Sequence, residues 1–291
     1  MCGIVGILCS DTQFPERELK HNLKNMSAQI RHRGPDGSGI WAHGPVGFAH
    51  RRLSIIDLNV RAAQPMLTPD QNLVITFNGE IYNFRDLRKE LEGFGHVFRT
   101  KSDTEVLLHG YWQWGQDLPR RLRGMFAFAI WDKEKREMFI ARDRFGKKPL
   151  VYTWCDNVFL FASEPKAILE WPYFKRGVDL EIIHDYMTYG YTPGAKTAFS
   201  NLNRLPPAHM MLLRAEHSAK NPPKIQKYWS LAPVDPGKAS MSIDHAAGEL
   251  RERLDDAIAV RLESDVPLGA FLSGGVDSSA LIARMSSMID E

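Results

Sequence analysis

Short apolar or alternating segments fill the first two-thirds of the chain and predict β-strands. Residues 3–8 form the first such segment, and residues 124–132 are among the most apolar stretches. Segments of this kind are typical of strands that bury one or both faces. The remaining predicted strands are residues 39–44, 46–56, 73–82, 137–143, 149–154, 158–163 and 204–213.

Three segments of the same region have the periodicity of helices. Residues 16–30 carry apolar side chains at spacings of four, three and four, which places them on one helical face. That face consists of Leu19, Leu23, Met26 and Ile30. Residues 84–94 and 103–114 are predicted helices as well. Because the strands come in runs with the helices grouped between them, we predict an α+β domain of layered antiparallel sheets and helices.

A polar stretch punctuated by proline separates this region from the C-terminal part. Residues 230–240 are predicted to be a linker. Residues 243–263 follow as an amphipathic helix, and residues 266–272 are predicted to be a strand that leads through a Gly-Gly turn into another helix. A strand, loop and helix in this order are typical of a parallel α/β domain. The predicted domains are therefore residues 1–229 and 241–291.

The composition is that of an ordinary globular protein. With 291 residues, 44% of them hydrophobic and 25% charged, the chain can bury a core in roughly two domains. A net charge of +2 gives no reason to expect nucleic acid or an anionic membrane as a partner. No stretch resembles a signal peptide or a membrane span, so we predict a cytoplasmic protein. Cys2, Cys9 and Cys155 have neither the spacing of a metal site nor the even number of a disulfide framework.

The segment SGGVDSS, residues 273–279, is the most informative part of the C-terminal region. Glycines after a strand let backbone N–H groups approach an anion, and a helix N-terminus favours negative charge. A turn with a simple helix cap would explain the pattern less completely, because a cap requires neither Ser-Gly-Gly before it nor Asp-Ser-Ser after it. The Gly-Lys-Ser/Thr of a Walker loop is absent from the sequence. The segment resembles the pyrophosphate loop of ATP pyrophosphatases, which adenylate a substrate and release pyrophosphate.

Cys2 directly follows the initiator methionine in the segment MCGIVGIL. One interpretation is a buried cysteine at the start of a strand, because a free thiol behaves as a small hydrophobe. The other is that removal of Met1 makes Cys2 an N-terminal nucleophile whose own α-amine serves as the base. An α-amine titrates near 8 and a thiol near 8.5, so the two groups can exchange a proton at neutral pH.

Two further segments also allow both a structural and a functional interpretation. Asn78 and Gly79 lie between β-rich runs, which is the strongest short signal for a hairpin turn, but their amide groups could also stabilise an oxyanion. Ser102 and Glu105 have the spacing of a helix capping box. In that case Asp103 would lie in the first turn of the helix, where its negative charge interacts favourably with the helix dipole. Asp103 could instead bind the ammonium group of a ligand.

Two clusters of basic residues follow predicted strands or lie at their ends. Arg51 and Arg52 are adjacent on a strand and must point to opposite faces, so that only one of them can reach a given ligand. Such an arginine could bind a carboxylate in bidentate fashion, although a solvated side chain is the default. Residues 142–149 read as a charged surface loop between strands.

Taken together, these segments resemble the glutamine-dependent asparagine synthetases. The motifs MCGIVGI, RHRGPDG, HRRLSIID, FNGEIYN, SDTEVLL, RDRFGKKPL and SGGVDSS occur in the order seen in that family, over essentially the whole chain. The resemblance implies an N-terminal class II glutamine amidotransferase domain with the N-terminal-nucleophile hydrolase fold, an αββα sandwich of two antiparallel sheets. It also implies that the second region is the beginning of an α/β adenine-nucleotide hydrolase-like synthetase domain.

The resemblance further assigns roles to individual residues. Cys2 is implied as the nucleophile, and Asn78 and Gly79 as the oxyanion hole. Arg52 would bind the glutamine carboxylate, because it occupies the Arg-Leu-Ser-Ile position of the family, and Glu80 and Asp103 would bind the glutamine α-ammonium. The implied glutamine site is completed by Leu53, Ser54, Ile55 and Ile56, and the implied ATP site consists of Leu272, Ser273, Gly274, Gly275, Asp277, Ser278 and Ser279.

The implied activity is the conversion of aspartate, glutamine and ATP to asparagine, with Mg²⁺ as the activating ion. Its partners would be these small molecules, with no nucleic acid and no membrane, and a homodimer is compatible with the resemblance. The family continues for some three hundred residues beyond SGGVDSS, so we expect this chain to retain mainly glutaminase chemistry. Alternatives are amidation of a sugar-acid, lipid or peptide carboxylate, a phosphoribosylpyrophosphate amidotransferase, which would lack SGGVDSS, and a non-enzymatic remnant.

Overall fold

The computed structural model describes residues 1–10, 14–214, 216–233 and 241–289. The chain divides into two compact units, Met1–Ser230 and Leu231–Glu291. Seven of the eleven residues of the predicted linker 230–240, residues 234–240, lie outside the described part.

The larger unit contains two six-stranded sheets whose strand pairs are all antiparallel. In spatial order, the first sheet consists of β10 (Asn203–Arg204), β8 (Val151–Cys155), β9 (Val158–Ala162), β1 (Gly3–Cys9), β3 (Val46–Arg52) and β2 (Gly37–His43). The second consists of β12 (Ile225–Lys227), β11 (His209–Arg214), β7 (Glu137–Arg142), β6 (Gly124–Asp132), β5 (Leu73–Ile81) and β4 (Met66–Leu67).

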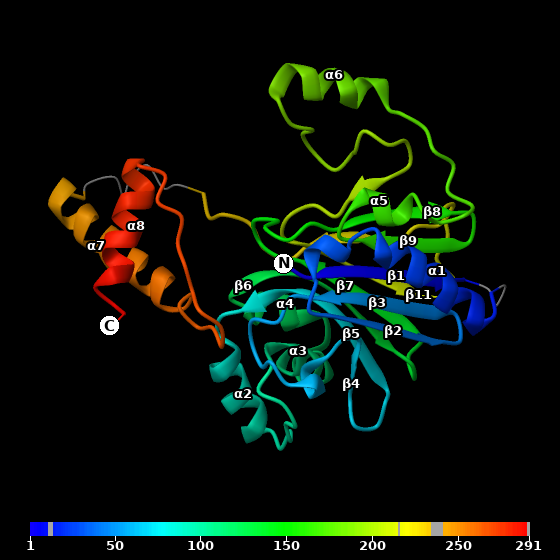
Figure 1. Cartoon of the computed structure of the whole chain (residues 1–291), viewed down its shortest axis with the longest axis horizontal. Helices are drawn as coiled ribbons and strands as arrows, with labels where there is room; N and C mark the ends of the chain where they lie inside the picture. Colours follow the sequence, from blue (N-terminus) through cyan, green and yellow to red (C-terminus); the bar gives the residue numbers. More distant parts are fainter. Residues whose placement is uncertain (11–13, 215, 234–240, 290–291) are drawn as a thin grey trace. The chain divides into compact units, whose positions relative to one another are not determined.

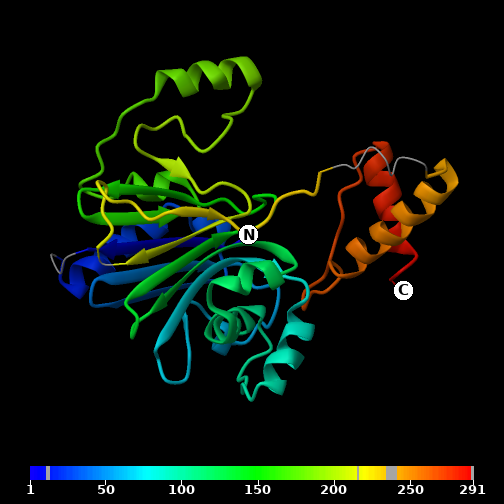
Figure 2. The same cartoon turned by 180° about the vertical axis from the view of Figure 1, so that it is seen from behind.

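Helices cover the outer faces of both sheets (Figure 1, Figure 2). The helices of this unit are α1 (Glu16–Ala28), α2 (Phe84–Gly93), α3 (Asp103–Trp114), α4 (Leu118–Arg121), α5 (Pro165–Ile168) and α6 (Leu180–Tyr189). Short 3₁₀ turns occupy Arg31–Arg33, Val60–Ala62 and Gly115–Asp117. None of the helices in the described ranges is long and apolar enough to cross a bilayer. The predicted α+β sandwich of two antiparallel sheets is confirmed.

The alternation of side chains along β1 explains why the sheets stack in this way. Ile4 and Leu8 pack into the core between the two sheets, whereas Val5 and Ile7 pack on the opposite face, against α1 and α5. Successive strand residues point to opposite faces. A strand that is apolar on both faces must therefore be covered on both, here by the second sheet on one side and by α1 and α5 on the other.

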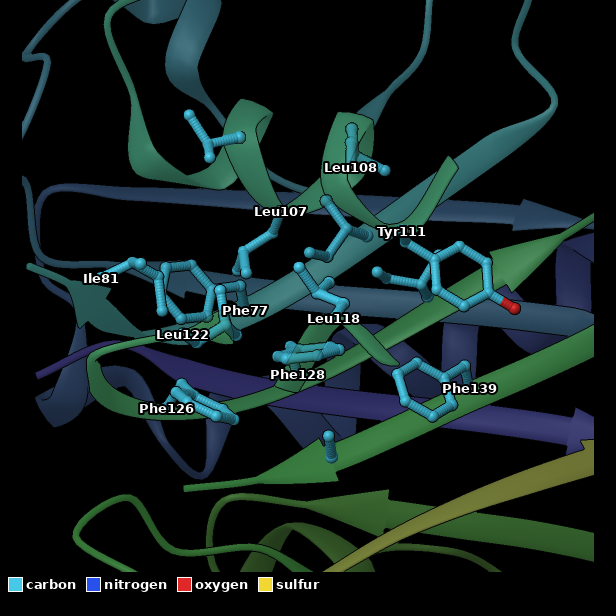
Figure 3. Close-up of a cluster of buried hydrophobic side chains, with 14 of the residues drawn as sticks. Phe77, Ile81, Leu107, Leu108, Tyr111, Leu118, Leu122, Phe126, Phe128 and Phe139 are labelled. Atoms are coloured by element: carbon cyan, nitrogen blue, oxygen red, sulfur yellow. The ribbon is translucent and has the colours of Figure 1, made fainter. Parts of the chain in front are cut away.

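A third core cluster lies on the outer face of the second sheet (Figure 3). Phe77, Phe126 and Phe128 project from β5 and β6 toward Leu107 and Leu118 of α3 and α4. Burying aromatic side chains of this size is worth about 1.5–3 kcal/mol each. The cluster therefore fixes the N-terminus of α3 against β5, and that junction lies at the candidate site described below.

The smaller unit differs from the prediction. Its described residues form two helices, α7 (Ile243–Ala259) and α8 (Val276–Ser286), which a bidentate ion pair between Arg284 and Asp255 joins at 2.7 and 2.5 Å. The strand predicted for residues 266–272 is absent from the described part of this unit, and Phe271 is fully exposed. An isolated strand has no neighbour to satisfy its backbone groups, which accounts for the difference.

Candidate active site

One cavity of about 230 Å³ in the larger unit brings most of the predicted site residues together. It lies where the start of β1, the end of β3, β5 and the start of α3 meet. Of the residues predicted from the sequence, the lining includes Cys2, Arg52, Leu53, Ile55, Ile56, Asn78, Gly79, Glu80 and Asp103. The lining also includes residues that sequence reasoning did not select: Met1, Ala62, Gln64, Phe77, Ser102, Thr104, Met125 and Lys148.

Cys2 immediately precedes β1, and the pairing of Gly3 with Arg51 fixes its position. Its Sγ accepts a hydrogen bond from the N–H of Leu53 at 3.4 Å and donates to the Leu53 carbonyl at 3.6 Å. Arg33 Nε donates to the Cys2 carbonyl at 2.8 Å. Burial raises the pKa of the Cys2 thiol, although the Leu53 N–H and the charge of the Met1 α-amine act in the opposite direction. The thiol therefore needs a base before it can attack a carbonyl carbon.

Asn78 and Gly79 lie inside β5 and not at a turn, so the hairpin prediction is wrong. Asn78 pairs with Ala127 and Gly79 with Phe126 of β6, and neither is among the residues with positive φ. A type I′ turn would require positive φ at both positions. Gly79 is needed for another reason: a Cβ there would lie 2.2 Å from the carbonyl oxygen of Met125. The close approach of β5 and β6 excludes any larger residue.

The side-chain amide of Asn78 is fully buried, and neither its nitrogen nor its oxygen has a hydrogen-bond partner. Leaving a buried polar group unpaired costs about 1–3 kcal/mol. Because the residue lines the cavity, a polar group of a bound molecule can provide the missing partner. An unpaired amide donor at this position is what an oxyanion hole requires.

Asp103 begins α3 and is 95% buried, with a relative exposure of 5%. Its Oδ2 accepts the Ile81 N–H at 3.0 Å. Burial, reinforced by the charge of Glu80, raises the pKa of the Asp103 carboxyl from 3.8 to about 7. A cation bound in the cavity would favour the ionised form of this carboxyl, which is consistent with a site for an ammonium group.

The predicted capping box forms only in part. Ser102 Oγ accepts the Thr104 N–H at 3.2 Å, as expected for a helix cap. The Glu105 carboxylate does not bond to the Ser102 N–H but accepts the N–H groups of Arg99 and Thr100, at 2.7–3.1 Å. Glu105 thus fixes the preceding loop, while the helix start holds Asp103 at the cavity.

The two adjacent arginines point to opposite faces, as predicted. Arg52 reaches the cavity, and its guanidinium donates to the carbonyls of Asn59 at 3.1 Å and Asp57 at 2.5 Å. Arg51 donates from Nε to the Ser27 carbonyl at 3.1 Å, at the end of α1. Only Arg52 is therefore available to a molecule in the cavity.

The segment after Arg52 is irregular, because β3 ends at that residue and not at Ile56 as predicted. Leu53, Ile55 and Ile56 line the cavity nevertheless. Ser54 lies outside the lining, and its N–H donates to Asp36 Oδ2 at 2.8 Å.

Residues 142–149 are a surface loop only in part: Phe145 and Lys147 are exposed as predicted, but Asp143 and Lys148 are buried, contrary to the prediction. Asp143 is 1% exposed and accepts four backbone N–H groups, those of Phe126, Phe145, Lys147 and Lys148. These bonds turn the loop inward. Lys148, which is 4% exposed, lines the cavity as a result.

Gln64 is a second residue that the sequence did not reveal. Its Oε1 accepts the Phe77 N–H at 2.6 Å, and its Nε2 donates to Thr104 Oγ1 at 3.2 Å. The side chain thereby joins β5 to the first turn of α3, on either side of the cavity. No local sequence signal distinguishes this glutamine from one at the surface.

The predicted ATP-binding residues lie in the smaller unit, around the start of α8. Gly274 has a φ of +79°, which favours glycine, and Gly275 caps the helix with its backbone. Ser273 Oγ and Ser278 Oγ lie 2.8 Å apart. In the described part of the chain, no group of three or more His, Cys, Asp or Glu side chains could hold a metal ion.

Similarity to solved structures shows which fold the chain has. A glutamine phosphoribosylpyrophosphate amidotransferase from Bacillus subtilis, complexed with ADP and GMP, matches with a TM-score of 0.56 at 20% identity, over 98% of this chain and 64% of that one. A structure described as the allosteric regulatory enzyme of purine biosynthesis matches with a TM-score of 0.57 at 20% identity, over 98% and 63%. The larger unit thus has the fold of the N-terminal-nucleophile hydrolase amidotransferases.

The chain belongs to the glutamine amidotransferase domain family, whose model matches residues 1–229. A second model, described as asparagine synthase, matches residues 249–290. Glutamine-hydrolyzing asparagine synthetases 3 and 1 of Bacillus subtilis are 40% and 37% identical, each over 97% of this chain but 45% and 43% of their own lengths. The synthetase of Sandersonia aurantiaca is 35% identical over 99% of this chain and 47% of its own. The chain spans less than half the length of these relatives.

Proposed function

We propose that the larger unit hydrolyses glutamine to glutamate and ammonia, with Cys2 as the nucleophile. The observation that carries this proposal is the position of the Cys2 thiol in one cavity with the buried, unpartnered amide of Asn78. A thiol and an unpaired amide donor are the two groups that acyl transfer from an amide requires. The relatives' names, which specify glutamine hydrolysis, support the same chemistry.

The reaction begins after removal of Met1, when the freed α-amine of Cys2 accepts the thiol proton. Sγ attacks the carbonyl carbon of the glutamine side-chain amide, and the oxygen that becomes negatively charged accepts hydrogen bonds from Asn78 and Gly79. The α-ammonium returns its proton to the leaving nitrogen, so that ammonia departs and a γ-glutamyl thioester remains. Water then hydrolyses the thioester and regenerates the thiol.

The remaining side chains of the cavity hold the amino-acid end of the substrate. Arg52 binds the α-carboxylate, because its guanidinium lies at the cavity and is oriented by two backbone carbonyls. Glu80 and Asp103 bind the α-ammonium, and the main chain of residues 53–56 closes the site. The raised pKa of Asp103 supports this role, since an ammonium group would offset the cost of the buried carboxylate.

For the smaller unit we propose that residues 272–279 bind the phosphates of ATP with Mg²⁺, and that aspartate is the acceptor of the ammonia. The match to the asparagine synthase model and the glycine-rich start of α8 support this proposal. The described part of the unit supplies two helices and this loop, so we propose that the polypeptide 1–291 retains mainly the glutaminase step. A sugar-acid, lipid or peptide carboxylate is the alternative acceptor.

Substitution of each cysteine in turn tests the glutaminase proposal. Cys2→Ala should abolish release of glutamate from glutamine, while Cys9→Ala and Cys155→Ala should leave it unchanged, because Cys9 lies in β1 and Cys155 in β8, away from the cavity. Intact-mass measurement of active protein should show that Met1 has been removed. Equal loss of activity in all three variants, or an active protein with Met1 retained, would refute the assignment of the nucleophile.

A further inference from the structure

Lys148 is a buried cation in the candidate active site to which the proposed reaction gives no role. It lies in the loop between β7 and β8, is 4% exposed and lines the same cavity as Cys2 and Glu80. Its backbone is fixed at both ends, because its N–H donates to Asp143 Oδ2 at 3.0 Å and its carbonyl accepts Arg142 Nε at 2.8 Å. Its neighbour Lys147 is exposed to solvent.

The ammonium group of Lys148 forms no ion pair with any carboxylate among the described residues. Burying an unpaired charge is costly, so such a group is retained only where it interacts with something in its surroundings. Burial lowers the pKa of Lys148, while the charges of Glu80, Cys2 and Asp143 raise it and Arg33 lowers it further. Its principal electrostatic neighbours at the cavity are therefore Glu80 and Cys2.

The effect of the Lys148 charge on Cys2 depends on how many protons the thiol and the α-amine of Cys2 hold together. The thiol and the α-amine titrate as a coupled pair, and the pair is competent once it has lost its first proton, whichever atom keeps the second. Losing a proton makes the pair one unit more negative, and a buried cation favours that change. The charges around the Met1 α-amine and the Cys2 thiol show the same signs: Glu80 raises the pKa of the Met1 amine and Asp103 that of the Cys2 thiol, whereas Lys148 lowers both and Arg33 lowers that of the amine.

We propose that Lys148 is a positioning residue whose ammonium charge favours loss of the first proton from the thiol–amine pair of Cys2. This proposal rests on the proposed glutaminase function. Lys148 thereby prepares the nucleophile at neutral pH without contacting the reacting amide. Arg52 already provides a cation for the substrate carboxylate, so Lys148 need not act as a second clamp. The test must therefore separate an effect on the nucleophile from an effect on substrate binding.

The experiment measures alkylation of Cys2 by iodoacetamide in the absence of glutamine, from pH 5.5 to 9.5. Cys9→Ala and Cys155→Ala in the background leave Cys2 as the only thiol, because the chain has three cysteines. Lys148→Met should move the titration of Cys2 reactivity upward by about one pH unit, which lowers the rate about tenfold at pH 7. Lys148→Arg should retain the wild-type profile, and Lys147→Met is the matched exposed control that should not change it.

The outcomes are separable. An unchanged alkylation profile in Lys148→Met overturns the proposal, and if the KM for glutamine is raised at the same time, Lys148 is a substrate clamp instead. The proposal is also overturned if Lys148→Met shifts the profile and Lys148→Arg shifts it equally, because the arginine retains the charge. If Lys148→Met does not fold, as judged by its circular dichroism, Lys148→Gln and Lys148→Arg provide the comparison. Failure of the glutaminase proposal would appear differently, as glutamine hydrolysis that survives Cys2→Ala.

Discussion

Replacing Asp103 by asparagine should stabilise the protein at pH 8 while it impairs glutamine hydrolysis. The carboxyl of Asp103 has a pKa of about 7 in the folded protein against 3.8 in an unfolded chain, because it is buried at the start of α3 beside Glu80. The folded state therefore binds the proton more tightly than the unfolded state. As pH rises from about 4 to 7, this difference makes the free energy of unfolding fall.

The magnitude follows from the two pKa values. Each pKa unit corresponds to about 1.4 kcal/mol, so the raised pKa of Asp103 lowers the free energy of unfolding by about 1.7 kcal/mol at pH 5 and by about 4.3 kcal/mol at pH 8. An asparagine imitates the neutral acid and keeps an oxygen that can accept the Ile81 N–H. Asp103→Asn should therefore gain about 2.6 kcal/mol more at pH 8 than at pH 5.

Urea denaturation followed by tryptophan fluorescence measures this difference. All seven tryptophans precede Ser230, so the signal reports unfolding of the larger unit. Asp86→Asn is the matched control, because Asp86 occupies the first turn of α2 but is exposed. That variant should lose only a few tenths of a kcal/mol through the helix dipole.

The expected loss of function separates this effect from ordinary stabilisation. Asp103→Asn should raise the KM for glutamine, because a neutral amide no longer attracts the substrate ammonium group. A stability difference that is the same at pH 5 and pH 8, or a variant less stable than wild type at pH 8, would refute the assignment of the buried charge. Active-site residues commonly trade stability for function in this way.

Two further predictions concern the ends of the proposed reaction. Arg52→Ala should raise the KM for glutamine roughly 30- to 1000-fold, equivalent to about 2–4 kcal/mol. Arg51→Ala should have a much smaller effect in the same glutaminase assay. Equal effects of the two substitutions would contradict the placement of the two side chains on opposite faces of the strand. Purified 1–291 incubated with glutamine, aspartate and Mg-ATP should release glutamate but no asparagine, and joint release of pyrophosphate and asparagine would disprove the proposed division of activity.

The sequence predicted the elements whose local pattern and tertiary surroundings agree. The helix expected at residues 103–114 has those bounds, and the helix expected at residues 16–30 ends only two residues earlier, at Ala28. The helix expected at residues 243–263 ends at Ala259. Apolar periodicity determines which face a segment buries, but the last turn of a helix depends on capping contacts that the pattern does not contain.

Other predictions failed where long-range pairing outweighed a local preference. Asn78 and Gly79 have the sequence of a tight turn, yet residues 73–81 run straight through them because β6 pairs along their whole length. Residues 266–272 show the opposite case, in which a strand-like sequence forms no strand because the described part of its unit offers no partner. In both cases, backbone hydrogen bonding with another strand decided the structure.

The two lysines at residues 147 and 148 show why the active site itself could be only partly predicted. Nothing in their immediate sequence distinguishes them, but one is exposed and the other lines the cavity with Cys2. The difference arises from Asp143, whose carboxylate accepts four backbone N–H groups and so sets the direction of the loop. One of those groups belongs to Phe126 of β6, so the direction of the loop depends on a strand of the second sheet. The charge at the cavity therefore depends on tertiary structure, which a local reading of the sequence does not provide.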